Sequence, residues 1–308
     1  MPELPEVETI ARGLAKRVTG DVIEDVWLGE KPEPLKSPAK AIAAALEGKT
    51  IEAVRREGKH IVFELVDGRA PEAQATGRAG IGAARAETPV PTSKRPIQTG
   101  ANTTKASIER AQWIVHLGMT GRLQVCDPSD EVAKHTHAIA RLASGRELRF
   151  VDPRRFGRLS VVTSGDFDAG GVEPLDVDLE RFVELFRGRK VFIKSALLNQ
   201  KLLRGVGNIY ADESLFRAGI RPRRRAASLT REELMKLHRA IKDVLREAIK
   251  AGGSSISDYV DANGDEGFFQ LRHRVYGREG EACLKCKTPI KRVVIGGRSS
   301  HYCAKCQR

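Results

Sequence analysis

The sequence of 308 residues has few aromatic residues, no long apolar segment and no internal repeat. Phenylalanine, tryptophan and tyrosine together make up 5% of it, and the hydrophobic share of 41% is somewhat low for a globular protein. No run approaches the roughly 18 apolar residues of a membrane span, and no charged-then-apolar signal segment precedes the first expected helix. These absences predict a cytoplasmic protein that does not associate with membranes. The length allows two domains, each with its own core.

Cysteine is also scarce, and acidic residues are outnumbered by basic ones. Four of the five cysteines fall in the last 26 residues, which in a cytosolic chain indicates a metal site rather than disulfides. The formal net charge of +13 favours a polyanionic partner. Nucleic acid is expected before a membrane surface, because no basic amphipathic helix with bulky aromatic residues is present.

The N-terminal half shows the pattern of short β-strands. Several segments alternate apolar and polar residues and are separated by glycine, which favours an antiparallel sandwich or barrel-like domain. A helix over residues 38–46 interrupts them. The expected strands are 22–28, 51–54, 60–66, 113–116, 122–126, 138–142, 147–151 and 159–163.

Residues 70–109 differ in composition from the rest of the chain. They include four prolines and four glycines but no leucine and no aromatic residue. Such a segment cannot bury enough apolar surface to offset its ordering entropy. We therefore expect a disordered insertion between the strands 60–66 and 113–116, which a hairpin turn would otherwise join.

Beyond a linker at residues 166–180 the pattern becomes helical. Helices are expected over 179–186, 194–203 and 208–218, and a capping box at Thr230 opens another that ends at Gly252. The expected domains are therefore a β domain over residues 1–165, a helical domain over 181–270 and a cysteine-rich module over 271–308.

The cysteine spacing is the strongest local signal. Cys283-x2-Cys286 and Cys303-x2-Cys306 are separated by sixteen residues, and two such knuckles provide four thiolates for one Zn²⁺. No coordination position remains for water, so the ion is expected to be structural and to stabilise a short β-hairpin. A redox role for either knuckle is the alternative. The basic residues around the module suggest phosphate contact. Cys126 has no partner and is expected to be buried.

Two further patterns bear on nucleic acid. Gly205-Val206-Gly207-Asn208 precedes a helix, so its amides could bind a phosphate, whereas Asn208 could simply cap the helix. Lys190, Lys194, Lys201 and Arg204 nearby favour phosphate binding. Met119 and Phe156 lie on turns bounded by glycine or proline. Each could be a core residue or an exposed wedge that unstacks a duplex.

The first residues carry a possible nucleophile. If Met1 is removed, Pro2 presents a secondary amine, and an α-amine has a pKa of about 7.7–8.0, so part of it is unprotonated near neutrality. Glu3 and Glu6 flank it at the start of a helix that opens near Pro5. The alternative is a proline at the start of the first helix, with carboxylates that merely complement the helix dipole.

Together these motifs resemble the bacterial formamidopyrimidine-DNA glycosylase family, whose members remove oxidised purines from DNA. The similarity covers nearly the whole chain except residues 70–109. Its motifs lie at residues 1–9, 58–59, 116–123, 152–157, 205–213 and 275–281 and in the cysteine segment. The resemblance implies an α+β fold: an N-terminal two-layer β-sandwich with flanking helices, a helix–two-turns–helix domain and a C-terminal four-cysteine zinc finger. Double-stranded DNA would bind between the domains.

The resemblance also implies roles for individual residues. Pro2 would be the nucleophile that forms a Schiff base, Glu3 the acid/base group, and Glu6 its support. Lys59 would serve β-elimination, and Arg298 would bind phosphate and serve δ-elimination. His116, His135, Arg154, Lys190 and Asn208 would contact DNA, and Met119, Arg154 and Phe156 would fill the vacated base stack. The protein would be a monomer associated with the bacterial nucleoid.

Two alternatives remain open at this stage. Glu3-Leu4-Pro5 favours this family over the related endonuclease VIII, whose start reads Glu-Gly-Pro and whose substrates are mainly oxidised pyrimidines. The sequence of residues 254–258 differs from the usual family sequence. In the family this loop covers the everted base, so the lesion preference is left open. The other alternative is a non-catalytic lesion-binding protein on the same scaffold.

Overall fold

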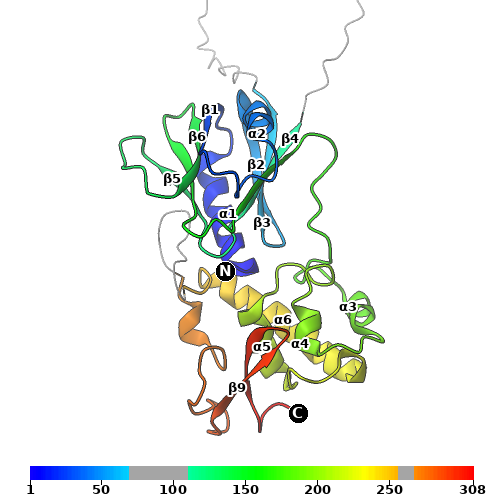
Figure 1. Cartoon of the computed structure of the whole chain (residues 1–308). Coiled ribbons are helices and arrows are strands. Elements are labelled where there is room, and N and C mark those ends of the chain that lie inside the picture. Colours follow the sequence, from blue (N-terminus) through cyan, green and yellow to red (C-terminus); the bar gives the residue numbers. More distant parts are fainter. Residues whose placement is uncertain (69–109, 256–266) are drawn as a thin grey trace, which may run out of the picture.

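The computed structural model describes residues 1–68, 110–255 and 267–308 and arranges them in two parts, one above the other (Figure 1). The upper part, here called the β domain, contains every strand up to Val162, and the lower part contains the later helices and the C-terminal hairpin. The predicted insertion at 70–109 lies outside the described residues, as does most of the segment 253–270. The predicted domain boundaries stay predictions.

The β domain consists of two four-stranded antiparallel sheets. Buried apolar side chains from both sheets form one core that includes Phe63, Trp113 and Phe150. The two-layer sandwich predicted from the sequence is therefore confirmed. One sheet has the order β1 (Ile23–Leu28), β6 (Thr136–Leu142), β7 (Glu147–Val151) and β5 (Arg122–Cys126), and the other has the order β2 (Lys49–Glu57), β3 (His60–Asp67), β4 (Ala111–His116) and β8 (Arg158–Val162).

Strands β3 and β4 are antiparallel neighbours although the predicted insertion separates them in the chain. Leu65 pairs with Ala111, and the pairing runs to His60 and His116 at the other end. The two segments therefore pair like the strands of a hairpin, as expected. Helix α2 (Ala39–Leu46) packs on this domain through Ile42 and Leu46.

The lower part contains α3 (Leu179–Phe186), α4 (Ile193–Leu197), α5 (Asn208–Ala218) and α6 (Arg231–Lys250), two short 3-10 turns (Ala226–Ser228 and Phe269–Arg272), and the hairpin β9 (Ile290–Ile295) and β10 (Arg298–Cys303). Thr230 caps α6 as predicted. Its hydroxyl accepts a hydrogen bond from the backbone amide of Glu233, and the Glu233 carboxylate accepts one from the backbone amide of Thr230. None of the helices among the described residues is long and apolar enough to cross a membrane.

The helix predicted over residues 194–203 is wrong beyond Leu197. The Asn199 side chain accepts the amide of Lys201 at 3.0 Å, a local turn that competes with helical hydrogen bonding. Gln200 then donates to the carbonyls of Leu198 and Val206, which folds the following residues into a compact loop.

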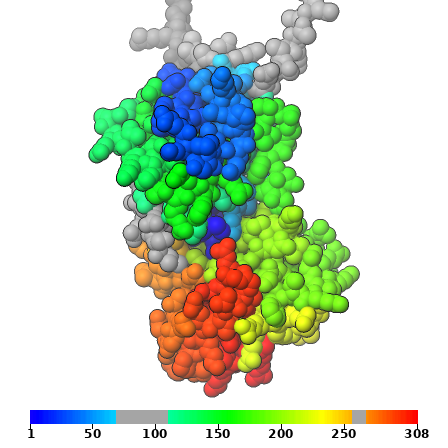
Figure 2. Space-filling model, viewed as in Figure 1, coloured from blue at the N-terminus to red at the C-terminus, as the bar shows by residue number. Residues whose placement is uncertain are grey.

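Helix α1 (Leu4–Val18) joins the two parts. Leu4 packs in the core of the lower part, whereas Val7, Ile10 and Leu14 pack in the core of the β domain. Glu3 is the N-cap of this helix and forms a capping box with Glu6. The first residues of the chain are therefore held where the two parts meet, as the blue atoms at the narrow waist of Figure 2 show.

Candidate active site

A cavity of about 500 Å³ lies between the two parts of the molecule. Its walls come from both: Glu3, Lys59 and Met119 on one side, and Asn208 and Arg298 on the other. These five residues were all candidates from the sequence, although they are spread over nearly the whole chain. The fold therefore brings three of the five predicted catalytic residues, Glu3, Lys59 and Arg298, to one cavity.

The backbone that follows Pro2 is held by two hydrogen bonds. Pro2 is buried, and Met1, which is 46% exposed, lines the cavity. The amide of Glu3 donates to Glu6 Oε2 at 2.8 Å, and the amide of Leu4 donates to the carbonyl of Gly205 at 3.0 Å. Pro2 therefore lies between two residues of the cavity wall, Met1 and Glu3, at the start of α1.

Glu3 lies against the N-terminus of α5. Its carboxylate accepts the backbone amides of Ile209 at 3.1 Å and, more weakly, Tyr210 at 3.5 Å. Burial raises the pKa of Glu3 to about 7, although Lys59 and the two amides oppose the rise. The group can thus both donate and accept a proton near neutrality, which suits general acid–base catalysis.

At the Gly205–Asn208 turn the cap interpretation of Asn208 is wrong, because the N-cap of the helix is Gly207. The carboxylate of Glu3 accepts the amides of Ile209 and Tyr210 at the start of this helix. A Cβ on Gly207 would lie 2.2 Å from Glu3 Cδ, so only glycine leaves room for this carboxylate. Asn208 is the first helical residue, and its buried Oδ1 has no hydrogen-bond partner among the described residues.

Lys59 lies in the two-residue turn between β2 and β3. Its side chain is almost completely buried, and this desolvation lowers its pKa below the usual value. The carboxylates of Glu3 and Glu6 oppose that shift, and Arg298 adds to it. A lysine with a lowered pKa is more often unprotonated at neutral pH and better able to accept a proton.

Glu6 is buried and is held by residues that sequence reasoning missed. Its Oε1 accepts the amide of Ser254 at 2.8 Å and the hydroxyl of Tyr210. Burial raises the pKa of Glu6, and these hydrogen bonds limit the rise. The sequence signal is Gly253, which follows the expected helix end at Gly252: a Cβ there would lie 2.9 Å from Glu6 Cγ.

The residues expected to contact the base stack are exposed. Met119 and Phe156 are 38% and 53% exposed, which favours the wedge interpretation over the core one. The Arg154 guanidinium lies over the Phe156 ring, 5.1 Å from its centroid. His135 and Lys190 are also exposed, outside the cavity wall.

His116 occupies a more interior position. Its ring lies 4.9 Å from that of His60, and its Nδ1 accepts the amide of Gly118 at 3.1 Å. Burial, together with nearby His60, lowers the pKa of His116 to about 3, so the ring is neutral. It supports the turn that carries Met119.

Lys194 and Arg204, two candidates from the sequence for a phosphate site, form ion pairs within the protein. Lys194 is fully buried, with Nζ 2.7 Å from Asp212 and donating to the carbonyl of Ser299. Arg204 pairs with Glu57. Both arrangements depend on residues distant in the sequence, so composition could not reveal them. Lys194 thereby fixes the hairpin that bears Arg298 against α5.

The four C-terminal cysteines form one cluster whose sulfur atoms all lie within 4.8 Å of one another. The separation is 3.4 Å between Cys286 and Cys303, and 3.9 Å between Cys283 and Cys306. Zn–S bonds of about 2.3 Å in a tetrahedron place sulfurs roughly 3.8 Å apart, so the residues fit one structural Zn²⁺. Cys126 lies far from them in the sheet and is only partly buried, not buried as expected.

Three family models together match most of the chain. The formamidopyrimidine-DNA glycosylase N-terminal domain matches residues 1–159, the H2TH domain of the same enzymes matches 171–260, and the zinc finger found in FPG and IleRS matches 280–308. The chain belongs to the formamidopyrimidine-DNA glycosylase family. It is therefore a DNA glycosylase with a zinc finger, and its four-cysteine cluster is the site of one structural zinc ion.

Individual relatives agree with this assignment. The formamidopyrimidine-DNA glycosylase of Solibacter usitatus is 40% identical, and that of Shouchella clausii is 38% identical, each over 100% of this chain and at least 99% of its own. Among solved structures, the MutM (Fpg) protein of Thermus thermophilus superposes with a TM-score of 0.77 at 37% identity, covering 99% of this chain and 98% of its own. The Lactococcus lactis Fpg in complex with abasic-site DNA superposes with a TM-score of 0.79 at 29% identity, covering 99% of each chain.

Proposed function

We propose that this glycosylase excises oxidised purines, such as 8-oxoguanine and formamidopyrimidines, from duplex DNA and then cleaves the strand by β,δ-elimination. The observation that carries the proposal is the position of Glu3. This carboxyl, whose pKa is about 7, follows Pro2 directly and shares a cavity with Lys59. A nucleophile, an acid/base group and a lysine with a lowered pKa are the groups that such a reaction needs.

In the first step, after removal of Met1, the nitrogen of Pro2 attacks C1′ of the damaged nucleotide. The bond between C1′ and the base breaks, and the base leaves with the bonding electrons and takes up a proton. The Pro2 nitrogen loses its proton as the new C–N bond forms. Glu3 in its protonated form then protonates the sugar ring oxygen as the ring opens, which gives a cationic iminium without a second deprotonation of the amine.

In the second step the iminium makes the C2′ proton acidic. Its removal, which we assign to Lys59, breaks the bond between C3′ and the 3′ phosphate oxygen. Loss of the 5′ phosphate by δ-elimination then follows, with Arg298 binding phosphate. Zinc supplies structure alone, because its four thiolate ligands leave no position for water. Neither step needs a metal-activated water.

For the DNA contacts we propose that His135, Arg154, Lys190 and Asn208 bind the backbone and that Met119 and Phe156 fill the stack. Their exposure, and the unpartnered Oδ1 of Asn208 beside the cavity, support these roles. His116 would support DNA binding indirectly, by holding the turn that carries Met119. We further propose a monomer in the bacterial cytoplasm, on nucleoid DNA.

An oxidised pyrimidine is the second candidate substrate. One related structure, the Lactococcus lactis Fpg, is described in complex with DNA that contains an oxidised pyrimidine, with a TM-score of 0.78 to this chain at 29% identity. A non-catalytic lesion-binding protein is the third candidate, and the presence of Pro2, Glu3 and Lys59 in one place argues against it.

The experiment compares matched duplexes that carry 8-oxoguanine, a formamidopyrimidine, thymine glycol or no lesion. Base release and strand cleavage are measured separately under single-turnover conditions. We expect both on the two purine lesions and much slower release of thymine glycol. Preferential release of thymine glycol would favour the pyrimidine candidate, and base release without strand cleavage would overturn the lyase proposal.

A further inference from the structure

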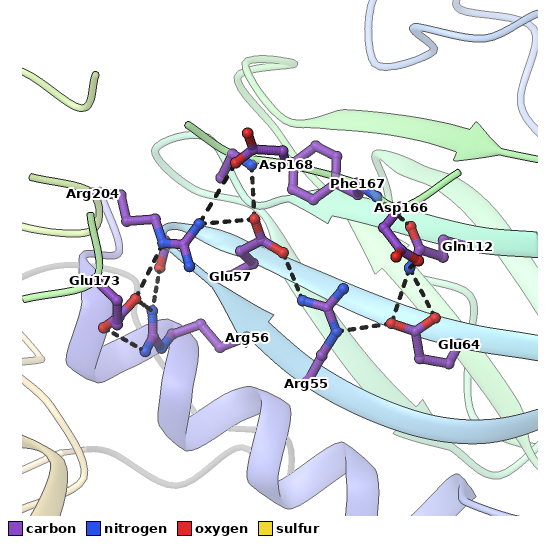
Figure 3. A network of polar contacts seen from close by, with 12 residues as sticks. Arg55, Arg56, Glu57, Glu64, Gln112, Asp166, Phe167, Asp168, Glu173 and Arg204 are labelled. Atoms are coloured by element: carbon purple, nitrogen blue, oxygen red, sulfur yellow. Dashed lines mark hydrogen bonds and ion pairs between the residues drawn. The ribbon is translucent and has the colours of Figure 1, made fainter. Parts of the chain in front are cut away.

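A network of buried and partly buried ion pairs joins the Lys59 turn to the lower part of the molecule (Figure 3). The Arg56 side chain, only 7% exposed, donates through Nε to Glu8 of α1 at 2.6 Å. Its two terminal nitrogens bind both oxygens of Glu173, at 3.0 and 2.9 Å, in the segment that links the two parts. One arginine of β2 is therefore bound to two separate elements.

A second arginine, from the lower part of the molecule, binds beside the same turn (Figure 3). Arg204 donates to Glu57 at 2.9 Å and lies 3.4 Å from Glu173. Glu57 is buried and also accepts the backbone amide of Ala169 at 2.8 Å. We call Arg56, Glu57, Glu173 and Arg204 the interdomain clasp.

The clasp fixes the backbone of the turn that contains Lys59. Glu57 is the last residue of β2, and Lys59 follows it by two positions. The carbonyl of Gly58 accepts a hydrogen bond from Arg56 at 3.2 Å, and a Cβ on Gly58 would lie 3.3 Å from Arg204 Cβ. Gly58 has φ +58°, a left-handed conformation that favours glycine. The turn is therefore held both by its own geometry and by residues of the lower part.

The other end of the clasp adjoins the chain that carries the proposed nucleophile. Arg204 is bound through its amide to the carbonyl of Val172 at 3.0 Å. The next residue, Gly205, accepts the amide of Leu4 through its carbonyl. One end of the clasp, Glu57, therefore precedes the Gly58-Lys59 turn. The other end, Arg204, precedes Gly205, which binds Leu4.

We propose that the interdomain clasp positions Lys59 for the strand-cleavage step, with Arg56, Glu57 and Arg204 as positioning residues. The inference rests on the proposed function of Lys59. A displacement of about 1 Å at a reacting group is enough to slow a reaction about 100-fold. Glu3, the residue next to Pro2, has anchors outside the clasp, at Glu6 and Ile209, so the clasp affects elimination more than attack on C1′.

The test uses Arg204→Met, Arg204→Lys and Glu57→Gln in the full-length protein with zinc bound. Glu247→Gln is the matched control, because Glu247 pairs with Arg217 at 2.7 and 2.8 Å within the lower part, away from Lys59. The substrate is a duplex with one preformed abasic site. Strand cleavage and borohydride-trapped adduct are followed in parallel single-turnover reactions, as functions of pH, together with thermal unfolding.

We expect Arg204→Met and Glu57→Gln to slow strand cleavage at least tenfold and to change the rate of adduct formation less than twofold. Arg204→Lys should restore part of the cleavage rate, and Glu247→Gln should leave both rates unchanged. The pH midpoint of cleavage should rise in Arg204→Met, since a turn released toward water desolvates Lys59 less. Wild-type cleavage rates in Arg204→Met and Glu57→Gln, or equal losses of cleavage and trapping, would overturn the inference but leave the proposed function intact. Absence of any trapped adduct in the wild type would overturn the proposed function and the inference with it.

Discussion

The carboxylate of Glu3 accepts the backbone amide of Ile209 at 3.1 Å, across 206 residues of sequence. This contact places an acid of the first α-helix on the positive N-terminal end of α5, where an anion is stabilised by the helix dipole and by free amides. Burial nevertheless raises the pKa of Glu3 to about 7. The opposing effects leave a group that changes protonation near neutral pH beside the proposed nucleophile.

The first prediction concerns Gly207, which makes room for that carboxylate. A Cβ at this position would lie 2.2 Å from Glu3 Cδ and 2.4 Å from Glu3 Oε1. The backbone of Gly207 has φ −129°, so alanine meets no backbone strain and the clash is with Glu3 alone. We expect Gly207→Ala to reduce base excision about 100-fold or more, measured by single-turnover base release.

The matched control for this substitution is Gly29→Ala, where the nearest atom to an added Cβ is 3.4 Å away, an ordinary van der Waals contact. It should excise at the wild-type rate. A double variant Gly207→Ala/Glu3→Ala should regain the thermal stability that Gly207→Ala loses. Normal excision by Gly207→Ala would show that the Glu3 position described here is not the active one.

The second prediction concerns pH and stability. Because the folded-state pKa of Glu3 is raised from 4.5 to about 7, the native state binds more protons than the unfolded state between these values. Glu3 therefore destabilises the fold as pH rises through this window, by about 3 kcal/mol once the pH exceeds 7. We expect the Tm of Glu3→Gln, relative to wild type, to increase from pH 4.5 to about pH 7 and to level off above it.

Differential scanning fluorimetry across this range measures that effect. Glu24→Gln serves as control, since Glu24 is an exposed residue of β1 outside the cavity. A pH-independent Tm difference between Glu3→Gln and wild type would contradict the raised pKa. Glu3→Gln should at the same time lose base excision, so stability and activity change in opposite directions above pH 7.

The third prediction concerns the exposed apolar turns. Met119→Ala and Phe156→Ala remove side chains that are 38% and 53% exposed, so each should change the free energy of unfolding by less than about 1 kcal/mol. Excision of 8-oxoguanine should nevertheless fall at least tenfold, because the vacated stack is left unfilled. Trp27→Ala is the control, since Trp27 is 45% exposed on β1. Equal activity of all three variants would remove the wedge role.

The fourth prediction concerns zinc. Elemental analysis should find one zinc per chain, and Cys286→Ser should lower that content and unfold the hairpin of β9 and β10. Arg298 lies on this hairpin, so DNA affinity and δ-elimination should fall together. The β domain should keep its far-ultraviolet circular dichroism, because its core shares no residue with that of the hairpin. Full DNA affinity without zinc would contradict the structural role.

Much of the fold follows from local sequence signals. The bounds of α3 and α5 agree with the expected ones, because glycine, proline and capping residues mark their ends, and Thr230 caps α6 as expected. The zinc cluster follows from cysteine spacing alone. The helix expected over 194–203 failed because Asn199 forms a side-chain turn within it.

The site was predictable as a set of residues but not as an arrangement. The resemblance located Glu3, Lys59, Asn208 and Arg298, and the structure places them around one cavity. Nothing local to Lys194 or Arg204 shows that their charges are paired with Asp212 and Glu57. Likewise, Tyr210 and Ser254 hold Glu6 only because α5 and the end of α6 meet α1 in the folded chain.

The central claim is that Pro2 forms the covalent intermediate, and borohydride trapping tests it most directly. The wild-type protein is reacted with an 8-oxoguanine duplex, the adduct is reduced, and the modified peptide is identified by mass spectrometry. We predict that the first residue is Pro2, that it carries the DNA remnant, and that Pro2→Gly traps far less adduct. An adduct on a lysine, or full trapping by Pro2→Gly through a lysine, would contradict the account.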